Sequence, residues 1–162
     1  MNIIILRCFA GFVTICFLIL LSYNLSVSSP LPTNNPCIAT VKHDLIYDNI
    51  SVNYVLSHKI VTVSGNSGYD TLRGTFTVND KHYIVGRTIK FTHEKIFSSN
   101  SHDFQIVSTH KFPSDNLPDD IANRFLSYLK NGPSRFLHLD RTDQLHILIS
   151  DTGGPSFICK HS

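Results

Sequence analysis

The side chains of this chain that could do chemistry include four cysteines, two of which lie far apart outside an apolar leader. Cys8 and Cys16 fall inside that leader, whereas Cys37 and Cys159 bracket nearly all that follows. In an oxidising compartment Cys37 and Cys159 can form only one intramolecular disulfide. Closing so long a loop stabilises the folded state by about 4–5 kcal/mol, because it lowers the entropy of the unfolded chain. We expect a Cys37–Cys159 disulfide, with two unpaired buried thiols as the alternative.

Nine histidines all follow the leader, and none falls at the close paired spacing of a zinc site, so we expect no metal. Protonating all nine near their ordinary pKa of about 6.5 would add nine charges at mildly acidic pH. A pH-responsive surface is therefore one hypothesis, with His138 and His146, in two apolar segments, as its preferred sensors. The alternative is that these imidazoles are ordinary solvated side chains, because a charge change alone is no switch.

Asp151-Thr152-Gly153, after an apolar segment, resembles the motif of aspartic proteases, but too few residues follow it to build the complementary half. No Gly-x-Ser-x-Gly elbow occurs either. We therefore expect no enzyme and no cofactor, and Asp151 to Gly154 is interpreted as a turn.

Composition limits the chain to one compact domain with a short appendage. It has 162 residues, 42% of them hydrophobic and 16% charged, with a net charge of +2. Neither a polyelectrolyte that binds nucleic acid nor a disordered acidic tail fits these values.

The appendage is an apolar leader at residues 1–23, which contains a single basic residue, Arg7. It is long enough to be an uncleaved membrane anchor, and a cleaved signal peptide remains the alternative. Either interpretation exports the rest, and Arg7 places the amino terminus in the cytoplasm. Residues 24–36, rich in Ser, Pro and Asn, form a linker, and 37–162 form the exported domain. We expect a single-pass protein of the bacterial inner membrane with its carboxy-terminal domain in the periplasm.

The exported domain has the two-residue alternation of antiparallel strands, clearest where Ile89 and Phe91 share one face. Asn79-Asp80 between two such segments predicts a two-residue hairpin turn. The expected strands are 38–42, 50–57, 59–64, 71–78, 81–93, 104–111, 135–139 and 145–150.

One segment has the helical period instead. In residues 118–130, Ile121, Phe125 and Leu129 recur every four residues, with acidic residues at the start and Asn-Gly-Pro after the end. The predicted fold class is α+β, mainly β: an antiparallel sheet or partly open barrel of seven or eight strands, with this helix packed on it.

This layout, with the patches Pro155 to Cys159 and Gly86 to Phe91, resembles small accessory proteins of ToxR-like transmembrane regulators, the ToxS/FidL-like class. In size and histidine content it is similar to the PsaF/MyfF group. The resemblance implies a heterodimer in which the exported domain binds and stabilises the regulator's exported domain, without touching DNA. It also implies that the pair helps sense a signal such as acidic pH or a bile-type ligand, and controls virulence and fimbrial gene expression.

The resemblance to bile-responsive pairs further allows a lipophilic small molecule beneath the sheet, with Phe76, Tyr83, Phe91 and Phe104 as candidate cavity residues; ordinary core packing is the alternative for these rings. The competing function is a secreted or periplasmic ligand-binding β-module that acts without a regulator.

Overall fold

A computed structural model describes residues 13–17, 35–64, 66–96, 100–126 and 134–161. The elements after the leader are β1 (Cys37–Tyr47), β2 (Ile50–Ser64), β3 (Ser67–Val78), β4 (Lys81–Lys95), β5 (Ser101–Lys111), α2 (Asp119–Phe125), β6 (Arg135–Arg141), β7 (His146–Asp151) and β8 (Gly154–His161).

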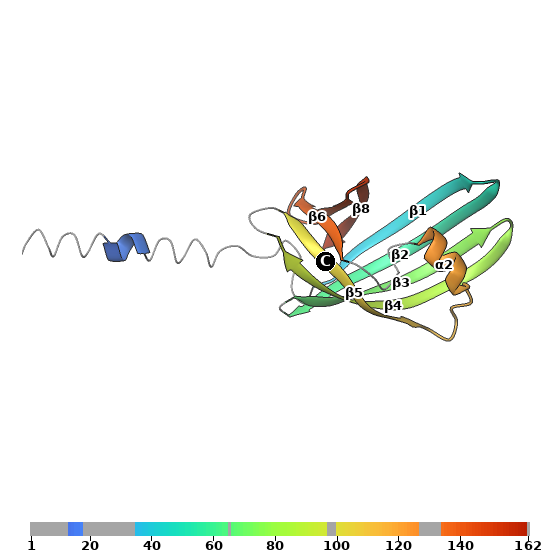
Figure 1. The fold of residues 1–162 in the computed structure, drawn as a ribbon, viewed down its shortest axis with the longest axis horizontal. Helices are drawn as coiled ribbons and strands as arrows, with labels where there is room; N and C mark the ends of the chain where they lie inside the picture. Colours follow the sequence, from blue (N-terminus) through green and yellow to red (C-terminus); the bar gives the residue numbers. More distant parts are fainter. Residues whose placement is uncertain (1–12, 18–34, 65, 97–99, 127–133, 162) are drawn as a thin grey trace, which may run out of the picture.

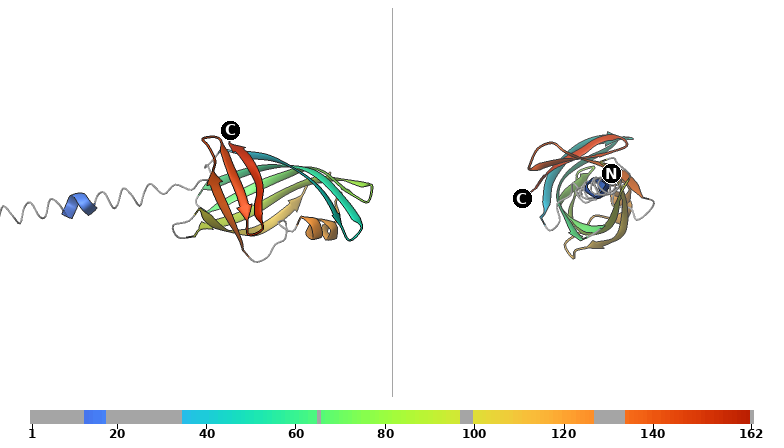
Figure 2. Two further views of the ribbon diagram at one scale, coloured as in Figure 1. Left: turned by 90° about the horizontal axis from the view of Figure 1, so that it is seen from above. Right: turned by 90° about the vertical axis from the view of Figure 1, so that its left-hand side faces the viewer.

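The eight strands form one closed antiparallel barrel in which each strand pairs with its neighbour in sequence and β8 pairs with β1. Figure 1 shows the barrel from the side, and the right-hand view of Figure 2 looks along it from the side of the leader. Residues 13–17 of the leader are helical, and within the described part of the chain no helix is long and apolar enough to cross a membrane.

Two tight turns set the register of the longest strands. Asn79 and Asp80 both have positive φ, as the predicted turn requires, and place Val78 opposite Lys81. Asp48 and Asn49 make the equivalent turn between β1 and β2. Each turn fixes which side chains of its hairpin face the interior, because a shift of one residue would exchange the two faces.

The wall of the barrel is paired very unevenly. β1 and β2 share eleven residue pairs, whereas β5 and β6 share four and β8 and β1 only two. Figure 1 shows the consequence: the hairpins β1–β2 and β3–β4 run well beyond the short strands β6 and β8, and α2 lies against this extended half.

The interior contains two separate apolar clusters. The first lies in the extended half, where Leu56, Leu72 and Phe76 pack with Ala122 and Leu126 from around α2. The second lies where the short strands β6, β7 and β8 face β1, β2 and β4, and comprises Cys37, Ala39, Ile60, Phe91, Leu139, Ile147, Ile149 and Cys159.

A buried ion pair holds the segment that leads into α2. The Asp115 carboxylate accepts hydrogen bonds from the Gly86 amide at 3.0 Å and from Arg87 Nε at 2.9 Å. Arg87 also donates to the Leu117 carbonyl oxygen at 3.0 Å. Burial acts to raise the pKa of Asp115, but the bonds from Arg87 and Gly86 and the charges of Arg87 and Lys111 outweigh it, so the pKa is lowered. The carboxylate therefore remains ionised and fixes the approach of α2 to β4.

The predicted α+β class with an open sheet or partly open barrel is wrong, because the described strands close into a barrel of eight. Its helix is only seven residues long, Asp119–Phe125, and contributes little to the fold. Residues 127–130 of the predicted helix lie outside the described residues, as do most of the leader 1–23 and linker 24–36.

Two strand predictions also need correction. The segments 50–57 and 59–64 are one continuous strand, β2, and 154–161 form an additional strand, β8. His58 faces the interior from within β2, and Gly154, the last residue of the expected turn, begins β8. That additional strand is the one that closes the barrel.

Candidate functional site

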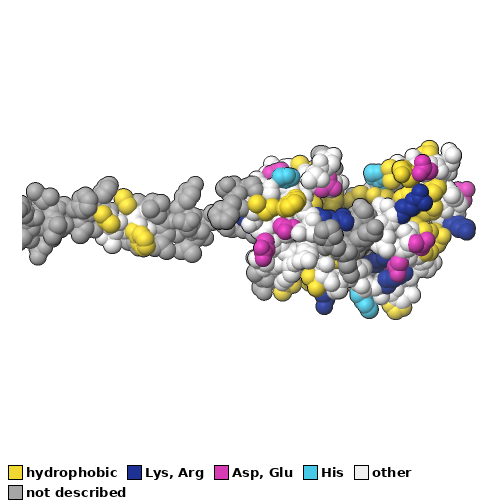
Figure 3. Space-filling model, viewed as in Figure 1, with side chains coloured by type: hydrophobic (Ala, Val, Ile, Leu, Met, Phe, Trp, Pro, Cys, Tyr) yellow, Lys and Arg dark blue, Asp and Glu magenta, His cyan; other side chains and the backbone are white. Residues whose placement is uncertain are grey.

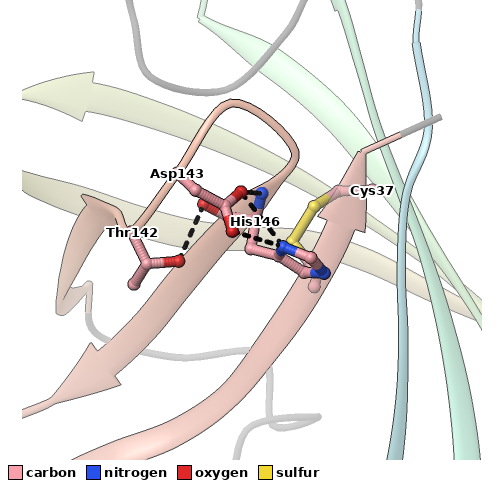
Figure 4. Close-up of a disulfide and its surroundings, with 5 residues drawn as sticks. Cys37, Thr142, Asp143 and His146 are labelled. Atoms are coloured by element: carbon pink, nitrogen blue, oxygen red, sulfur yellow. Dashed lines mark hydrogen bonds and ion pairs between the residues drawn. A yellow bond between two sulfur atoms is a disulfide. The ribbon is translucent and has the colours of Figure 1, made fainter.

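The structure contains the predicted disulfide between Cys37 and Cys159, with a Cα–Cα distance of 5.4 Å. It lies where β1 and β8 meet, since Cys37 is opposite His161 and Ile38 opposite Lys160. Figure 4 shows the disulfide beside His146, the first residue of β7, and near Thr142 and Asp143 of the preceding turn. This covalent bond thus reinforces a junction that has only two residue pairs.

A cavity of about 410 Å³ lies inside the barrel, and each of the eight strands contributes at least one residue to its lining. Its walls are mainly apolar: Val41, Tyr54, Ile60, Ile89, Phe91, Phe104, Ile106, Leu137, Leu139, Ile149 and Phe157. Its polar residues are His43, His58, Asp70, Arg135, Asp151 and Ser156. Cavities of this size and lining are typical of sites for small amphipathic molecules.

One polar pair lies deep in the cavity wall. His58 Nδ1 is 2.7 Å from Asp70 Oδ2, and both residues are buried. The His58 ring also stacks on Phe157, with ring centroids 4.9 Å apart. This arrangement fixes the imidazole between a carboxylate on β3 and an aromatic ring on β8.

The cavity opens where its lining becomes exposed, at His43 on β1 and at Asp151 and Ser156 around the β7–β8 turn. Arg135, at the start of β6, lines the same region and is half-buried. Burial lowers the pKa of this guanidinium, and the charge of Asp151 acts in the opposite direction. The mouth therefore combines a cation and an anion, and the interior is apolar.

Two of the four candidate ligand residues, Phe91 and Phe104, line the cavity. Phe76 and Tyr83 do not: Phe76 is fully buried in the cluster beside α2 and stacks on Tyr54 at 5.3 Å, while Tyr83 packs against the same cluster. Phe76 and Tyr83 are opposite one another near the β3–β4 turn, beyond the cavity. The alternation of inward and outward residues predicts which face of a strand a side chain lies on, but not how far along the barrel it lies.

The predicted pH sensors His138 and His146 occupy strands β6 and β7, as expected, but neither faces the cavity. His138 is exposed, with Nδ1 2.8 Å from Ser101 Oγ. His146 Nδ1 is 2.9 Å from Asp143 Oδ2. Backbone hydrogen bonding from Leu145, together with the His146 contacts, lowers the pKa of the Asp143 carboxyl. Their part in pH sensing stays a prediction.

Two other histidines, which the sequence analysis did not single out, are almost fully buried: His93 is 4% and His102 1% exposed. Both ring nitrogens of each lack a hydrogen-bond partner. The alternation that places Ile89 and Phe91 on one face also places His93 there, so extending it by one step would have found this residue.

One edge of β1 is unpaired over most of its length. Only Cys37 and Ile38 pair with β8, and in the described part of the chain no other strand pairs with 39–47 on that side. Figure 3 shows the surface hollowed between the lobe of β6 and β8 and the extended hairpins, with hydrophobic side chains in the hollow.

Among described residues, no three His, Cys, Asp or Glu side chains gather as metal ligands would.

The described residues thus form a closed β-barrel with a disulfide at its junction and a mainly apolar cavity. Residues 74–159, from the middle of β3 to β8, match the family described as "FidL-like putative membrane protein", and the chain belongs to this family. No curated protein matches the chain.

Proposed function

We propose that this chain is a membrane-anchored accessory protein whose barrel, in the periplasm, binds the exported domain of a ToxR-like transmembrane regulator. Membership of a family of membrane proteins supports the anchoring, together with the apolar leader. A disulfide between the outer cysteines supports an oxidising compartment. Binding would stabilise the regulator and adjust its control of virulence and fimbrial genes.

The observation that carries this proposal is the unpaired edge of β1. Tyr47 and Ile50 flank a two-residue turn and form a hydrogen-bonded pair, so odd-numbered residues of β1 bond β2. The backbone N–H and C=O of Thr40, Lys42 and Asp44 therefore point away from β2, toward the unpaired side. Such an edge is a ready template for a strand from another protein.

Apolar side chains flank this edge. At the β1–β2 turn Ile46 is 85% exposed and Tyr47 57% exposed. Ile158, on the outer face of β8, is 54% exposed. If a partner strand paired with β1, the partner's surface beside that strand would contact these side chains. Burying them favours association by about 25 cal/mol per Å² of apolar surface.

The edge also borders the mouth of the cavity, because His43 belongs to β1 and lines the opening. A partner bound there would cover the mouth of the cavity. A ligand in the cavity would therefore change the surface that the partner contacts. We propose a lipophilic, bile-type molecule as one signal, its apolar body in the cavity and an acidic group at Arg135. Acidic pH sensed at His138 and His146 is the other signal proposed.

Replacing Lys42 with proline tests the edge directly. Proline removes an outward N–H without removing a β1–β2 hydrogen bond, whereas Lys42→Ala keeps the backbone donor and removes the same side chain. Full-length protein carrying each change is co-purified from membranes with the exported domain of a co-encoded regulator. We expect Lys42→Pro to lose at least about tenfold in affinity, as the loss of backbone bonds to a strand would give, and Lys42→Ala to bind normally. Equal binding by both variants would remove edge pairing from the proposal.

The cavity favours a second candidate function, a ligand-binding barrel that acts without a regulator. Fractionation separates the two, since this alternative expects soluble protein cleaved after the leader, and the accessory function expects an intact amino terminus in the inner membrane. Binding of an apolar fluorescent probe without any regulator binding would favour the alternative.

A further inference from the structure

His93 and His102 are neighbours on the inner face of the barrel wall. His93 is opposite Phe104 and His102 is opposite Lys95, so the two imidazoles lie diagonally across β4 and β5. Their ring centroids are 5.6 Å apart. The Phe104 ring stacks on His93 at 5.3 Å with planes 21° apart, which connects the pair to the cavity wall.

The residues around His93 and His102 do not stabilise a protonated imidazole. Neither ring nitrogen of either histidine has a hydrogen-bond partner. The charges that act on His102 come from His93 and Lys95, and both oppose protonation. Glu94 is exposed on β4. Asp103 occupies the position of β5 next to His102 and alternates with it, but its Oδ1 is buried without a hydrogen-bond partner.

The other strands at this end supply few charges. Leu137 of β6 is opposite His102, and the described start of β3 contributes Ser67 and Gly68. Arg135 faces inward from β6 further along, and it too is a cation. His161 is the inward titratable side chain of β8 at this end, and its Nδ1 is also buried without a partner.

His102 lies in the short junction between β5 and β6, which has four residue pairs, as many as the junction between β6 and β7. The four β5–β6 pairs run from Ser101–His138 to Phe104–Arg135. Phe104 and Arg135 both line the cavity, so separation of these two strands would open the cavity wall.

We propose that His93 and His102 form an acid-sensitive latch, which keeps the β5–β6 junction and the adjoining cavity wall closed while both imidazoles are neutral and releases them when they are protonated. This inference concerns the barrel alone and does not depend on a regulator or on His138 and His146.

The direction of the pH effect follows from burial. Burial, then the charges of His93 and Lys95, lower the pKa of His102 from 6.5 to about 4, and burial lowers the pKa of His93. The opened junction, with ordinary imidazoles, binds more protons than the closed one. The closed state is thus fully favoured above about pH 6.5 and loses stability as the pH falls toward 4.

The test is amide hydrogen exchange on the full-length protein in detergent micelles, corrected for the pH dependence of chemical exchange. For His102 alone, the opening constant of residues 101–104 and 135–138 should rise about 20-fold between about pH 7 and about pH 5. The double variant His93→Phe/His102→Phe, which keeps aromatic packing, should abolish this rise. His110→Gln, a change in an exposed histidine of β5 outside this junction, should retain it.

NMR titration of the wild-type imidazoles gives a second readout that needs no variant to fold. A pKa for His102 well below that of model histidine supports the latch. Values near 6.5 for both histidines, equal corrected exchange at the two pH values, or an acid response that survives in the double variant would each overturn it.

Discussion

Cys37 and Cys159 are joined beside the two residue pairs that connect β1 to β8 in the described part of the chain. Cys159 is also opposite Ile147 of β7, and both cysteines belong to the second apolar cluster. The covalent bond therefore holds the closure of the barrel and one of its two cores together.

Reducing this bond should cost much of the stability of the barrel. The cysteines are 122 residues apart, and the chain-entropy model gives about 5 kcal/mol for a loop of that length. Denaturant unfolding of wild type and Cys159→Ser, with and without reductant, measures the loss. Cys16→Ser is the matched control and should leave the unfolding midpoint unchanged; a Cys159→Ser midpoint equal to it would contradict the prediction.

Replacing Asp115 with alanine should destabilise the protein by about 3–5 kcal/mol, because the buried Arg87 would lose its partner. Asp119→Ala is the control, since that carboxylate contacts the same guanidinium at 3.2 Å but its side chain is 66% exposed. It should cost less than about 1 kcal/mol. Urea unfolding at neutral pH measures both, and similar losses would show that burial of the pair is unimportant.

The lowered pKa of Asp115 also predicts a pH dependence. The folded state binds this proton less well than the unfolded chain, so the stabilisation is complete above the ordinary value of 3.8 and disappears as the pH falls through the lower folded pKa. The difference in unfolding free energy between wild type and Asp115→Ala should therefore shrink in strong acid. A constant difference down to about pH 2 would refute this account.

Gly74→Ala should be destabilising for steric reasons. A Cβ at Gly74 would lie 2.0 Å from the Val55 carbonyl oxygen on the paired strand β2, so the backbone of one strand must move. We expect a loss of about 1–3 kcal/mol by thermal unfolding. Gly153→Ala is the comparison, because its nearest neighbour is the flexible Asp151 carboxylate at 3.2 Å, and it should be much milder.

Arg135→Gln should weaken binding of an anionic amphiphilic probe about tenfold, the effect of losing one charged contact. A neutral apolar probe of similar size should bind equally to both proteins. Arg141→Gln, an exposed position on the same strand, is the control. Fluorescence titration of the two probes decides, and equal loss for both would mean that Arg135 shapes the cavity rather than contacting an anion.

Local pattern in the sequence predicted the alternation of Ile89 and Phe91 and the Asn79-Asp80 turn. The Cys37–Cys159 disulfide was predicted from the number of cysteines outside the leader, with no knowledge of how the strands meet. The sequence did not predict closure, because closure depends on β8 meeting β1 across the whole chain. Nor did it separate Phe104, which lines the cavity, from Phe76, which fills the core, since both are inward aromatic residues of strands. Their difference is distance along the barrel, and no local pattern encodes that.

The two-pair junction of β1 with β8 has a consequence for biogenesis. In a protein exported from its amino terminus, Cys37 emerges 122 residues before the thiol it must meet. In the proposed periplasmic location it would be exposed to thiol oxidases throughout that interval, while the preceding strands could already pair. Maturation thus waits for the final strand, and mixed disulfides at Cys37 are the species that a stalled or truncated product should accumulate.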